Sequence, residues 1–258
     1  MTYHQIMEHF LIFRRNFLPT VAAFVLIMSG VVFYPQSSIA NSDFVQSRPL
    51  VVVELFTSQG CSSCPPADKF LTDLMARGDV LPLSLHVDYW DYIGWKDPFA
   101  SPLFTNRQRQ YASKMALRYV YTPQMVIQGV YQAVGSRRGE VLGMIEQAKS
   151  IAQVPITLTR KNGDIRLSLG AYKLSSAVDV IAVFFDKRHE TPIRRGENSG
   201  RKMINSNVVR DLKRVTRWDG DALSLKITSD WENKTDATAI VLQSRTTGEI
   251  IGAAQLDL

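Results

Sequence analysis

The segment between residues 50 and 87 constrains the fold more strongly than any other part of the chain. Residues 50–57, LVVVELFT, are almost continuously apolar and β-branched, which is typical of a strand buried on both faces. Apolar side chains then recur at helical spacing from Ala67 to Met75, and residues 80–87, VLPLSLHV, alternate like a second strand. Because no hairpin turn separates the two strands, the helix between them predicts a parallel βαβ unit.

The chain has two cysteines, Cys61 and Cys64, and both lie between that first strand and that helix, in GCSSCPPAD. A helix starting at Cys61 would carry Pro66 in its interior, where proline removes a hydrogen bond and clashes with the preceding turn. Pro65 also disfavours helical angles at the residue before it. We therefore predict that Cys64 is the N-cap, with the two prolines at the first helical positions. Cys61 then lies in the preceding loop and gains less from the helix dipole.

The segments up to residue 150 continue this α/β order. An aromatic loop, residues 88–102, precedes a helix that Ser101 caps and that ends near Leu117. Two short strands then meet at Gln128-Gly129, a pair of residues typical of a hairpin turn. A last helix spans about residues 138–150. These segments predict a first domain, residues 48–152, with a central mixed sheet flanked by helices.

The pattern changes after Pro155. A hairpin with Asn162-Gly163 at its tip is followed by several β-rich segments separated by Gly, Asp and Asn. Only SNVVRDLKRV, residues 206–215, offers a helical period. We predict that residues 155–258 form a mostly antiparallel β-domain, a small sandwich that packs on the first domain.

The first forty residues have the order of a secretory signal peptide. Arg14 and Arg15 precede an apolar run over residues 17–34, and Ser38 and Ala40 suit a small-residue cleavage site. The paired arginines also resemble a twin-arginine export signal. The alternative is an uncleaved membrane anchor, because the apolar run nearly spans a bilayer. We predict a periplasmic or secreted chain, whose cysteines meet an oxidising compartment.

The order strand, Cys-x-x-Cys, helix, strand, helix, Thr122-Pro123, hairpin, helix resembles the thioredoxin superfamily over about residues 50–150. The resemblance implies that Cys61 is the attacking thiol and Cys64 the resolving one. It also implies that Pro123 is a cis-proline facing the cysteines, which presents backbone to an extended substrate and keeps metal away from the sulfurs.

Glu54 is the further site residue that the resemblance suggests. Thioredoxins hold a buried acid six residues before the first cysteine, and Glu54 stands seven before Cys61. It would accept the proton of the resolving thiol if the loop bulges; otherwise it points to an edge or pairs with a lysine.

Longer segments are similar to a family of exported, thioredoxin-like bacterial proteins whose function is uncharacterised. The segments that carry this second resemblance are ELFTSQGCSSCPPAD, HVDYWDYIGWKDPF, YTPQMVIQG and RRGENSGRKMINSNVVRDLKR. This resemblance implies an architecture for nearly the whole mature chain and no particular activity.

Three functions remain open at this point. The first is an exported thiol–disulfide oxidoreductase that needs no cofactor and acts on thiol- or disulfide-containing exported proteins. The second is copper binding or delivery through Cys61, Cys64 and His86, because two thiolates and an imidazole suit Cu(I). The third is a non-catalytic binding protein with a static Cys61–Cys64 disulfide.

Other features leave the choice open. Trp90 and Trp95 either line a substrate groove or cover the edge of the core, while Asp88 and Asp91 either titrate near the site or cap their loop. The net charge of +6 is too diffuse to indicate nucleic-acid binding. A local basic cluster favours a solvated face, with weak contact to a membrane surface as the functional alternative: Arg194, Arg195, Arg201, Lys202, Arg210, Lys213 and Arg214. The oligomeric state is not predicted.

Overall fold

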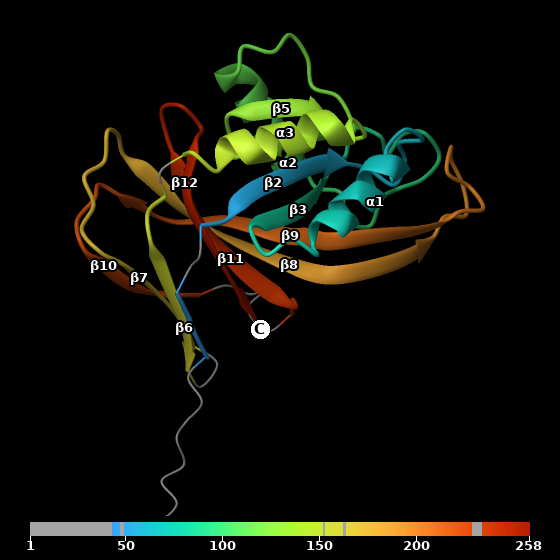
Figure 1. Ribbon diagram of the computed structural model, residues 1–258. Coiled ribbons are helices and arrows are strands. Elements are labelled where there is room, and N and C mark those ends of the chain that lie inside the picture. The colour runs from blue at the N-terminus through green and yellow to red at the C-terminus, as the bar shows by residue number, and fades with distance from the viewer. Residues whose placement is uncertain (1–42, 47–48, 152, 162–163, 229–233) are drawn as a thin grey trace, which may run out of the picture. The chain divides into compact units, whose positions relative to one another are not determined.

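An eight-stranded mixed sheet runs through the unit formed by residues 40–258 (Figure 1). The computed structural model describes residues 43–46, 49–151, 153–161, 164–228 and 234–258, so the predicted signal peptide lies outside the described residues. The strand order in this sheet is β12-β11-β8-β9-β3-β2-β4-β5. The strands are β2 (Val51–Thr57), β3 (Val80–His86), β4 (Gln124–Ile127), β5 (Tyr131–Val134), β8 (Val178–Pro192), β9 (Lys202–Trp218), β11 (Ala237–Ser244) and β12 (Ile250–Asp257).

A second, four-stranded sheet is antiparallel throughout and has the order β1-β6-β7-β10. Its strands are β1 (Asp43–Gln46), β6 (Ile156–Lys161), β7 (Asp164–Leu169) and β10 (Leu223–Ile227). The predicted pairing of the hairpin after Pro155 is confirmed, since Lys161 lies opposite Asp164, although the predicted tip residues 162–163 fall outside the described part.

Three α-helices occur in the described ranges: α1 (Pro65–Leu74), α2 (Pro102–Lys114) and α3 (Arg138–Ala148). Within those same ranges, none of the helices has the length and apolar character needed to cross a membrane. The predicted start of α2 is confirmed because the Ser101 hydroxyl accepts a hydrogen bond from the amide of Leu103 at 3.2 Å. The predicted hairpin turn is also confirmed, with positive φ angles of 51° at Gln128 and 71° at Gly129.

The predicted βαβ unit is confirmed. Strands β2 and β3 pair in parallel from Val51 opposite Val80 to Thr57 opposite His86, and α1 connects them. Cys64 is the N-cap of α1, with prolines at the first two helical positions, as predicted. The expectation that Pro65 keeps its neighbour out of helical angles is wrong. Cys64 has φ −77° and ψ −35°, and its carbonyl accepts the first two helical amide hydrogen bonds.

The predicted fold class, a thioredoxin-like α/β domain followed by a small antiparallel sandwich, is wrong. Strands β8, β9, β11 and β12 continue the sheet of β2–β5, and β9 joins it in parallel to β3 at Ser84 opposite Val208. SNVVRDLKRV lies inside β9 and is not helical. Local periodicity shows which side chains become buried, but it does not show which strand edge each segment will pair with. The predicted domain boundaries, residues 48–152 and 155–258, remain a prediction.

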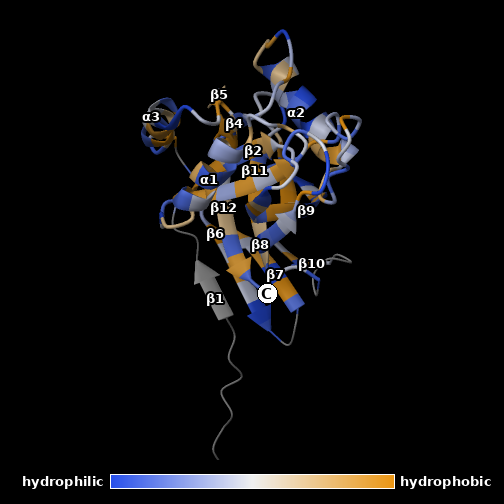
Figure 2. Cartoon of the chain, turned by 90° about the vertical axis from the view of Figure 1, so that its right-hand side faces the viewer, coloured by the Kyte–Doolittle hydropathy of each residue, from blue (hydrophilic) through white to orange (hydrophobic). Residues whose placement is uncertain are grey.

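Helices cover both faces of the sheet around β2. Helices α1 and α3 pack on the face that carries Val53 and Leu55, and α2 packs on the face that carries Phe56. A third apolar cluster joins the four-stranded sheet to β8, β11 and β12. The apolar residues gather in these layers (Figure 2). Because β2 and β3 are parallel, their carboxyl ends meet at one edge, and the cysteine loop begins there.

Candidate functional site

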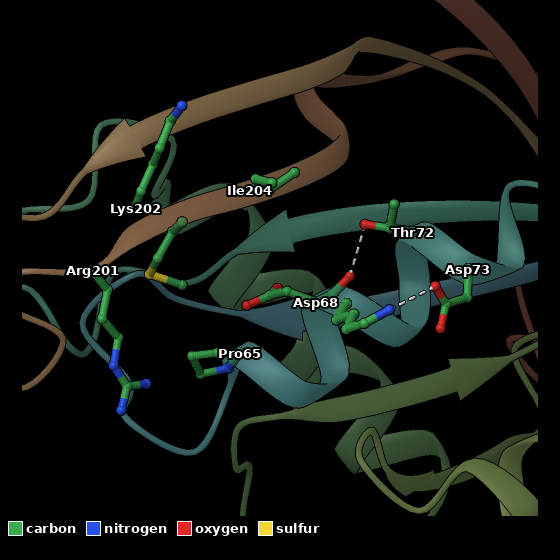
Figure 3. A pocket seen from close by; sticks show the side chains of 9 residues that line it. Pro65, Asp68, Thr72, Asp73, Arg201, Lys202 and Ile204 are labelled. Carbon is green, nitrogen blue, oxygen red and sulfur yellow. Dashed lines mark hydrogen bonds and ion pairs between the residues drawn. The ribbon is translucent and has the colours of Figure 1, made fainter.

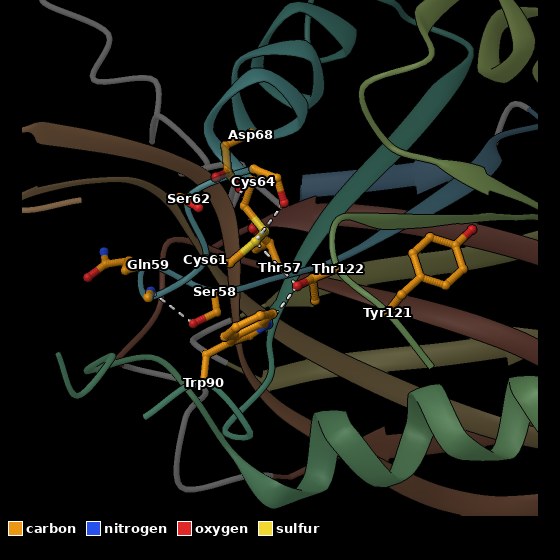
Figure 4. The surroundings of a disulfide bond; sticks show 12 residues. Thr57, Ser58, Gln59, Cys61, Ser62, Cys64, Asp68, Trp90, Tyr121 and Thr122 are labelled. Carbon is orange, nitrogen blue, oxygen red and sulfur yellow. Dashed lines mark hydrogen bonds between the residues drawn. A yellow bond between two sulfur atoms is a disulfide. The ribbon is translucent and has the colours of Figure 1, made fainter. Parts of the chain in front are cut away.

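A disulfide joins Cys61 to Cys64 where the chain leaves β2 and enters α1 (Figure 4). The two Cα atoms are 5.5 Å apart. The cysteines are only 1% and 0% exposed, whereas Ser62 and Ser63 between them face solvent. The exposed part of the cysteine loop is therefore its two serines.

Thr122 directs a proton at the first sulfur. Its hydroxyl donates to Cys61 Sγ at 3.3 Å and accepts a hydrogen bond from the indole Nε1 of Trp90 at 2.7 Å. An indole N–H only donates, so Trp90 keeps the hydroxyl lone pair occupied. The hydroxyl proton is then available to the sulfur and would stabilise a thiolate there. The Thr122-Pro123 bond that follows is cis.

The connection between β8 and β9 holds the cysteine loop from the other side. The Asn198 amide donates to the carbonyls of Gln59 at 2.9 Å and Cys61 at 3.0 Å, and Glu197 accepts from the Ser62 amide at 3.2 Å. The sequence analysis assigned neither residue to the site, because it used this segment only for its basic side chains and for the family resemblance. No local signal relates residue 198 to a loop so distant in sequence.

Asp68 is the buried acid closest in sequence to the disulfide, one helical turn after Cys64. The Thr57 hydroxyl donates to Asp68 Oδ1 at 2.9 Å. Burial raises the pKa of Asp68 to about 7, although the nearby charge of His86 opposes this shift. The carboxyl is therefore poised to take up or release a proton near neutral pH.

A second buried pair lies beside Asp68. His86 Nδ1 is 2.7 Å from Asp97 Oδ2, and both side chains have no exposed surface. Asp97 also accepts hydrogen bonds from the backbone amides of Gln59 at 2.7 Å and Phe99 at 3.0 Å. Burial disfavours the charged imidazole, but the opposite charge and hydrogen bond of Asp97 outweigh it, so the pKa of His86 is raised. Burial likewise acts against the carboxylate of Asp97, but His86 and the backbone amides lower its pKa overall.

Glu54 belongs to a different cluster. It lies on β2 between Val52 and Phe56, and its carboxylate oxygens accept from Arg107 Nε at 2.5 Å and Nη2 at 3.0 Å. The Tyr111 hydroxyl donates to the same carboxylate at 2.5 Å. Both oxygens are thus occupied by a buried ion pair with an arginine of α2, and the structure brings Asp68 rather than Glu54 next to the cysteines.

The copper alternative gains no support from the geometry. Across the described ranges, no group of three or more His, Cys, Asp or Glu side chains is arranged to hold a metal ion. The two sulfurs are bonded to each other, and His86 uses Nδ1 on Asp97.

The aromatic loop is tied into the fold by hydrogen bonds. Trp95 Nε1 donates to Gln59 Oε1 at 3.1 Å, and Trp90 packs against the core beside Gly60. Asp88 accepts from the Thr105 hydroxyl at 2.5 Å, and Asp91 accepts from the Asp97 amide at 3.1 Å. Both carboxylates hold the loop in place, and Trp90 reaches the disulfide through Thr122.

The fold and site define a protein with a mixed sheet and a buried Cys-x-x-Cys disulfide at the end of two parallel strands. The chain belongs to a family described as "Protein of unknown function (DUF1223)", whose profile matches residues 52–243. The resemblance to a family of uncharacterised function is confirmed. No curated protein matches the chain.

Two solved structures are similar to this chain. A crystal structure of an Agrobacterium tumefaciens protein, determined as a structural genomics target, has a TM-score of 0.72 and 32% identity, covering 81% of this chain and 95% of that one. HBP35 of Porphyromonas gingivalis has a TM-score of 0.57 and 12% identity, covering 82% of this chain and 76% of that one, which shows a likeness of fold alone.

Proposed function

We propose that the protein is an exported thiol–disulfide oxidoreductase that uses Cys61 and Cys64 as its redox pair. The observation that carries the proposal is that each cysteine has a proton-handling group nearby. Thr122 donates to Cys61 Sγ, and Asp68, with a pKa of about 7, lies one helical turn after Cys64. A static disulfide needs neither group, and buried carboxyls with a strongly raised pKa cluster at functional sites.

The chemistry follows from these positions. A substrate thiolate attacks Cys61 Sγ, the Cys61–Cys64 bond breaks, and Cys64 leaves as a thiolate that takes up a proton. A second substrate thiolate then attacks the substrate sulfur bonded to Cys61, so the substrate gains a disulfide and Cys61 leaves with the electron pair. Two electrons pass from the substrate dithiol to the protein disulfide, and the same steps in reverse reduce a substrate.

Several features support Cys61 as the sulfur that meets substrate. It accepts a hydrogen bond from Thr122, and the neighbouring Ser62 and Ser63 are exposed. The predicted signal peptide, residues 1–40, supports an oxidising compartment for this exchange.

The redox potential separates an exchanging pair from a static one. Equilibration of the purified chain in glutathione buffers is expected to give a Cys61–Cys64 potential between about −270 and −120 mV, the span of known redox-active pairs. The measurement is the fraction of free thiol at each glutathione ratio. A potential below about −300 mV would identify a structural disulfide and refute the proposal.

A trapping variant tests the substrate step. Cys64→Ala leaves Cys61 unable to resolve a mixed disulfide, so exported proteins are expected to accumulate bonded to Cys61. The matched control is Cys61→Ala, which keeps one cysteine but removes the proposed attacking sulfur. Non-reducing electrophoresis followed by peptide identification checks the result, and equal trapping by both variants would contradict the assigned roles.

Thr122→Val is expected to raise the pKa of the Cys61 thiol in the reduced protein by about one unit, because a hydrogen bond to a charged group stabilises it by roughly 1.5–3 kcal/mol. Thr122→Ser, which keeps the hydroxyl, is the control. Thiolate absorbance against pH measures the shift. An identical titration curve in Thr122→Val and the wild type would show that the hydroxyl does not act on the sulfur.

A further inference from the structure

A pocket of about 370 Å³ lies between α1 and β9 (Figure 3). Pro65 at the start of the helix and Met203 and Ile204 of the strand give it an apolar surface. Ile204 is 41% exposed, and a large apolar side chain in the open beside a hollow is typical of a surface that binds a partner. The volume is at the lower end of the range for ligand pockets, roughly 300–1,000 Å³, and suits one large side chain with its neighbours.

Both walls of the pocket are joined to the loop that carries the disulfide. Pro65 directly follows Cys64 and is the first residue of α1. On the other wall, Arg201 donates to Asn198 Oδ1 at 3.2 Å, and the Asn198 amide donates to the Cys61 carbonyl at 3.0 Å. The pocket therefore adjoins the redox pair.

Arg201 supplies a positive charge at the rim of the pocket. Its side chain is exposed, and among the described residues no carboxylate lies within ion-pair distance of it. The two lysines that line the pocket differ in this respect, since Lys69 pairs with Asp73 at 3.2 Å and Lys202 pairs with Glu190. A guanidinium has five N–H donors and binds a carboxylate through two parallel hydrogen bonds. Arg201 is therefore suited to bind a carboxylate of a partner.

The two carboxyls that line the pocket do not cancel this charge. Asp73 is held by Lys69 and, at 2.8 Å, by Arg138. Asp68 is 4% exposed, and burial raises its pKa to about 7, so it is only partly ionised at neutral pH. The connection between β8 and β9 adds two further exposed arginines, Arg194 and Arg195. This face of the molecule is therefore positive around an apolar hollow.

We propose that the pocket binds a polypeptide segment of the redox partner in which an apolar side chain stands next to a carboxylate. The apolar side chain enters between α1 and β9, beside Ile204, and the carboxylate binds Arg201. This inference rests on the proposed redox function and names the class of polypeptide on which it acts: exported proteins with an acidic, apolar segment beside the reacting cysteine. Arg201 and Ile204 are then the residues that determine specificity.

The shape of the site favours a polypeptide over a membrane surface. Attachment to a bilayer requires apolar side chains that project into the lipid, whereas a hollow takes in a side chain that projects from a partner. The pocket is also separate from the predicted substrate contact at Pro123. Strands β9 and β4 flank the β3–β2 pair on opposite sides, and Pro123 directly precedes β4.

Three short synthetic peptides test the pocket on the wild-type chain. Each carries two cysteines, and they differ only in the two residues before the first cysteine: Glu-Leu, Lys-Leu or Glu-Ser. The oxidised chain should convert the Glu-Leu peptide to its disulfide form about 5-fold faster than Lys-Leu and about 10-fold faster than Glu-Ser. Acid quenching and chromatography measure these rates, which are divided by the rate of each peptide with uncharged hydroxyethyl disulfide to correct for its own thiol reactivity.

Salt separates the two contributions on the same protein. At an ionic strength of about 0.5 M, the preference for Glu-Leu over Lys-Leu should largely disappear, because an exposed ion pair is screened. The preference for Glu-Leu over Glu-Ser should remain, because burial of an apolar side chain is not weakened by salt.

Two substitutions locate the preferences in the pocket. Arg201→Glu should reverse the first preference, so that the Lys-Leu peptide reacts faster than Glu-Leu. Ile204→Ser should reduce the advantage of Glu-Leu over Glu-Ser to about threefold, because less apolar surface is left to bury the leucine. Lys173→Glu changes an exposed lysine outside the pocket and is the matched control, which should keep all three rates.

The outcomes separate this inference from the proposed function. Equal corrected rates for the three peptides, or wild-type preferences in Arg201→Glu, would overturn the inference while leaving the redox pair intact. Binding to phosphatidylglycerol vesicles that Arg201→Glu abolishes, together with equal peptide rates, would also overturn it and assign this face to a membrane surface. No oxidation of any peptide, with a potential below about −300 mV for the cysteine couple, would instead refute the redox function itself.

Discussion

Arg107→Met is expected to lower the free energy of unfolding at pH 7 by about 3–5 kcal/mol, the largest loss that we predict for a single substitution. The side chains of Arg107 and Glu54 are 11% and 2% exposed, and they meet at 2.5 Å. Burial lowers the pKa of Arg107, but the charge of Glu54 outweighs it and raises that pKa overall. Without the guanidinium, the Glu54 carboxylate stays buried with only Tyr111 as a partner.

Urea unfolding followed by tryptophan fluorescence measures this loss. Arg109→Met on the exposed side of the same helix is the matched control, and its effect should stay within about 0.5 kcal/mol. The double variant Glu54→Leu with Arg107→Met should regain much of the stability, because removing both charges also removes the uncompensated buried carboxylate. A loss equal to that of Arg109→Met would show that the pair does not stabilise the fold.

Asp68→Asn is expected to stabilise the protein above pH 7. Burial raises the folded-state pKa of Asp68 from 3.8 to about 7, so between these values the folded chain retains a proton that the unfolded chain releases. The contribution of Asp68 to the free energy of unfolding is therefore largest below pH 4 and falls as the pH rises toward 7. The rise in pKa from 3.8 to about 7 corresponds to a loss of at most about 4 kcal/mol in the free energy of unfolding above pH 7. Asparagine does not ionise, so the Asp68→Asn variant would not suffer this loss.

Unfolding free energies at pH 4, 6 and 8 check this prediction. The difference between Asp68→Asn and the wild type should grow with pH and stop growing above 7. Asp73→Asn should gain no stability as the pH rises, because its ion pairs with Arg138 and Lys69 lower the pKa of Asp73. The Thr57 hydroxyl can still donate to the asparagine oxygen, so the packing around the site is retained. Parallel stability curves for the two proteins would contradict the raised pKa.

The two substitutions at Asp68 and Arg107 have opposite expected signs, and this contrast bears on function. The Glu54–Arg107 pair is fully hydrogen-bonded and acts as part of the core. Asp68 is expected to lower stability at neutral pH, because burial raises its pKa in the folded chain. A residue that weakens the fold where a neutral side chain would fit is typical of a site kept for its chemistry.

Part of the site could be predicted because it depends on neighbours in sequence. Pro65 and Pro66 restrict where α1 can begin, and they place Cys64 at its N-cap whatever surrounds it. Asp68 also had a local signal, since it stands four residues after Cys64 and so shares its side of the helix. Acidic residues are common in the first turn of a helix because the helix dipole favours them there. The position of Asp68 alone therefore does not indicate a role at the disulfide.

The sequence by itself determined the elements that neighbouring residues control: the helix starts, the hairpin turn at Gln128-Gly129 and the parallel pair β2–β3. Only the tertiary structure decided that β9 pairs with β3 and that Asn198 comes to the cysteine loop. Strand partners are chosen by burial and edge pairing between segments far apart in the chain, and no local pattern encodes that choice. The pairing of Glu54 on β2 with Arg107 on α2 is likewise a contact between segments that only the tertiary structure brings together.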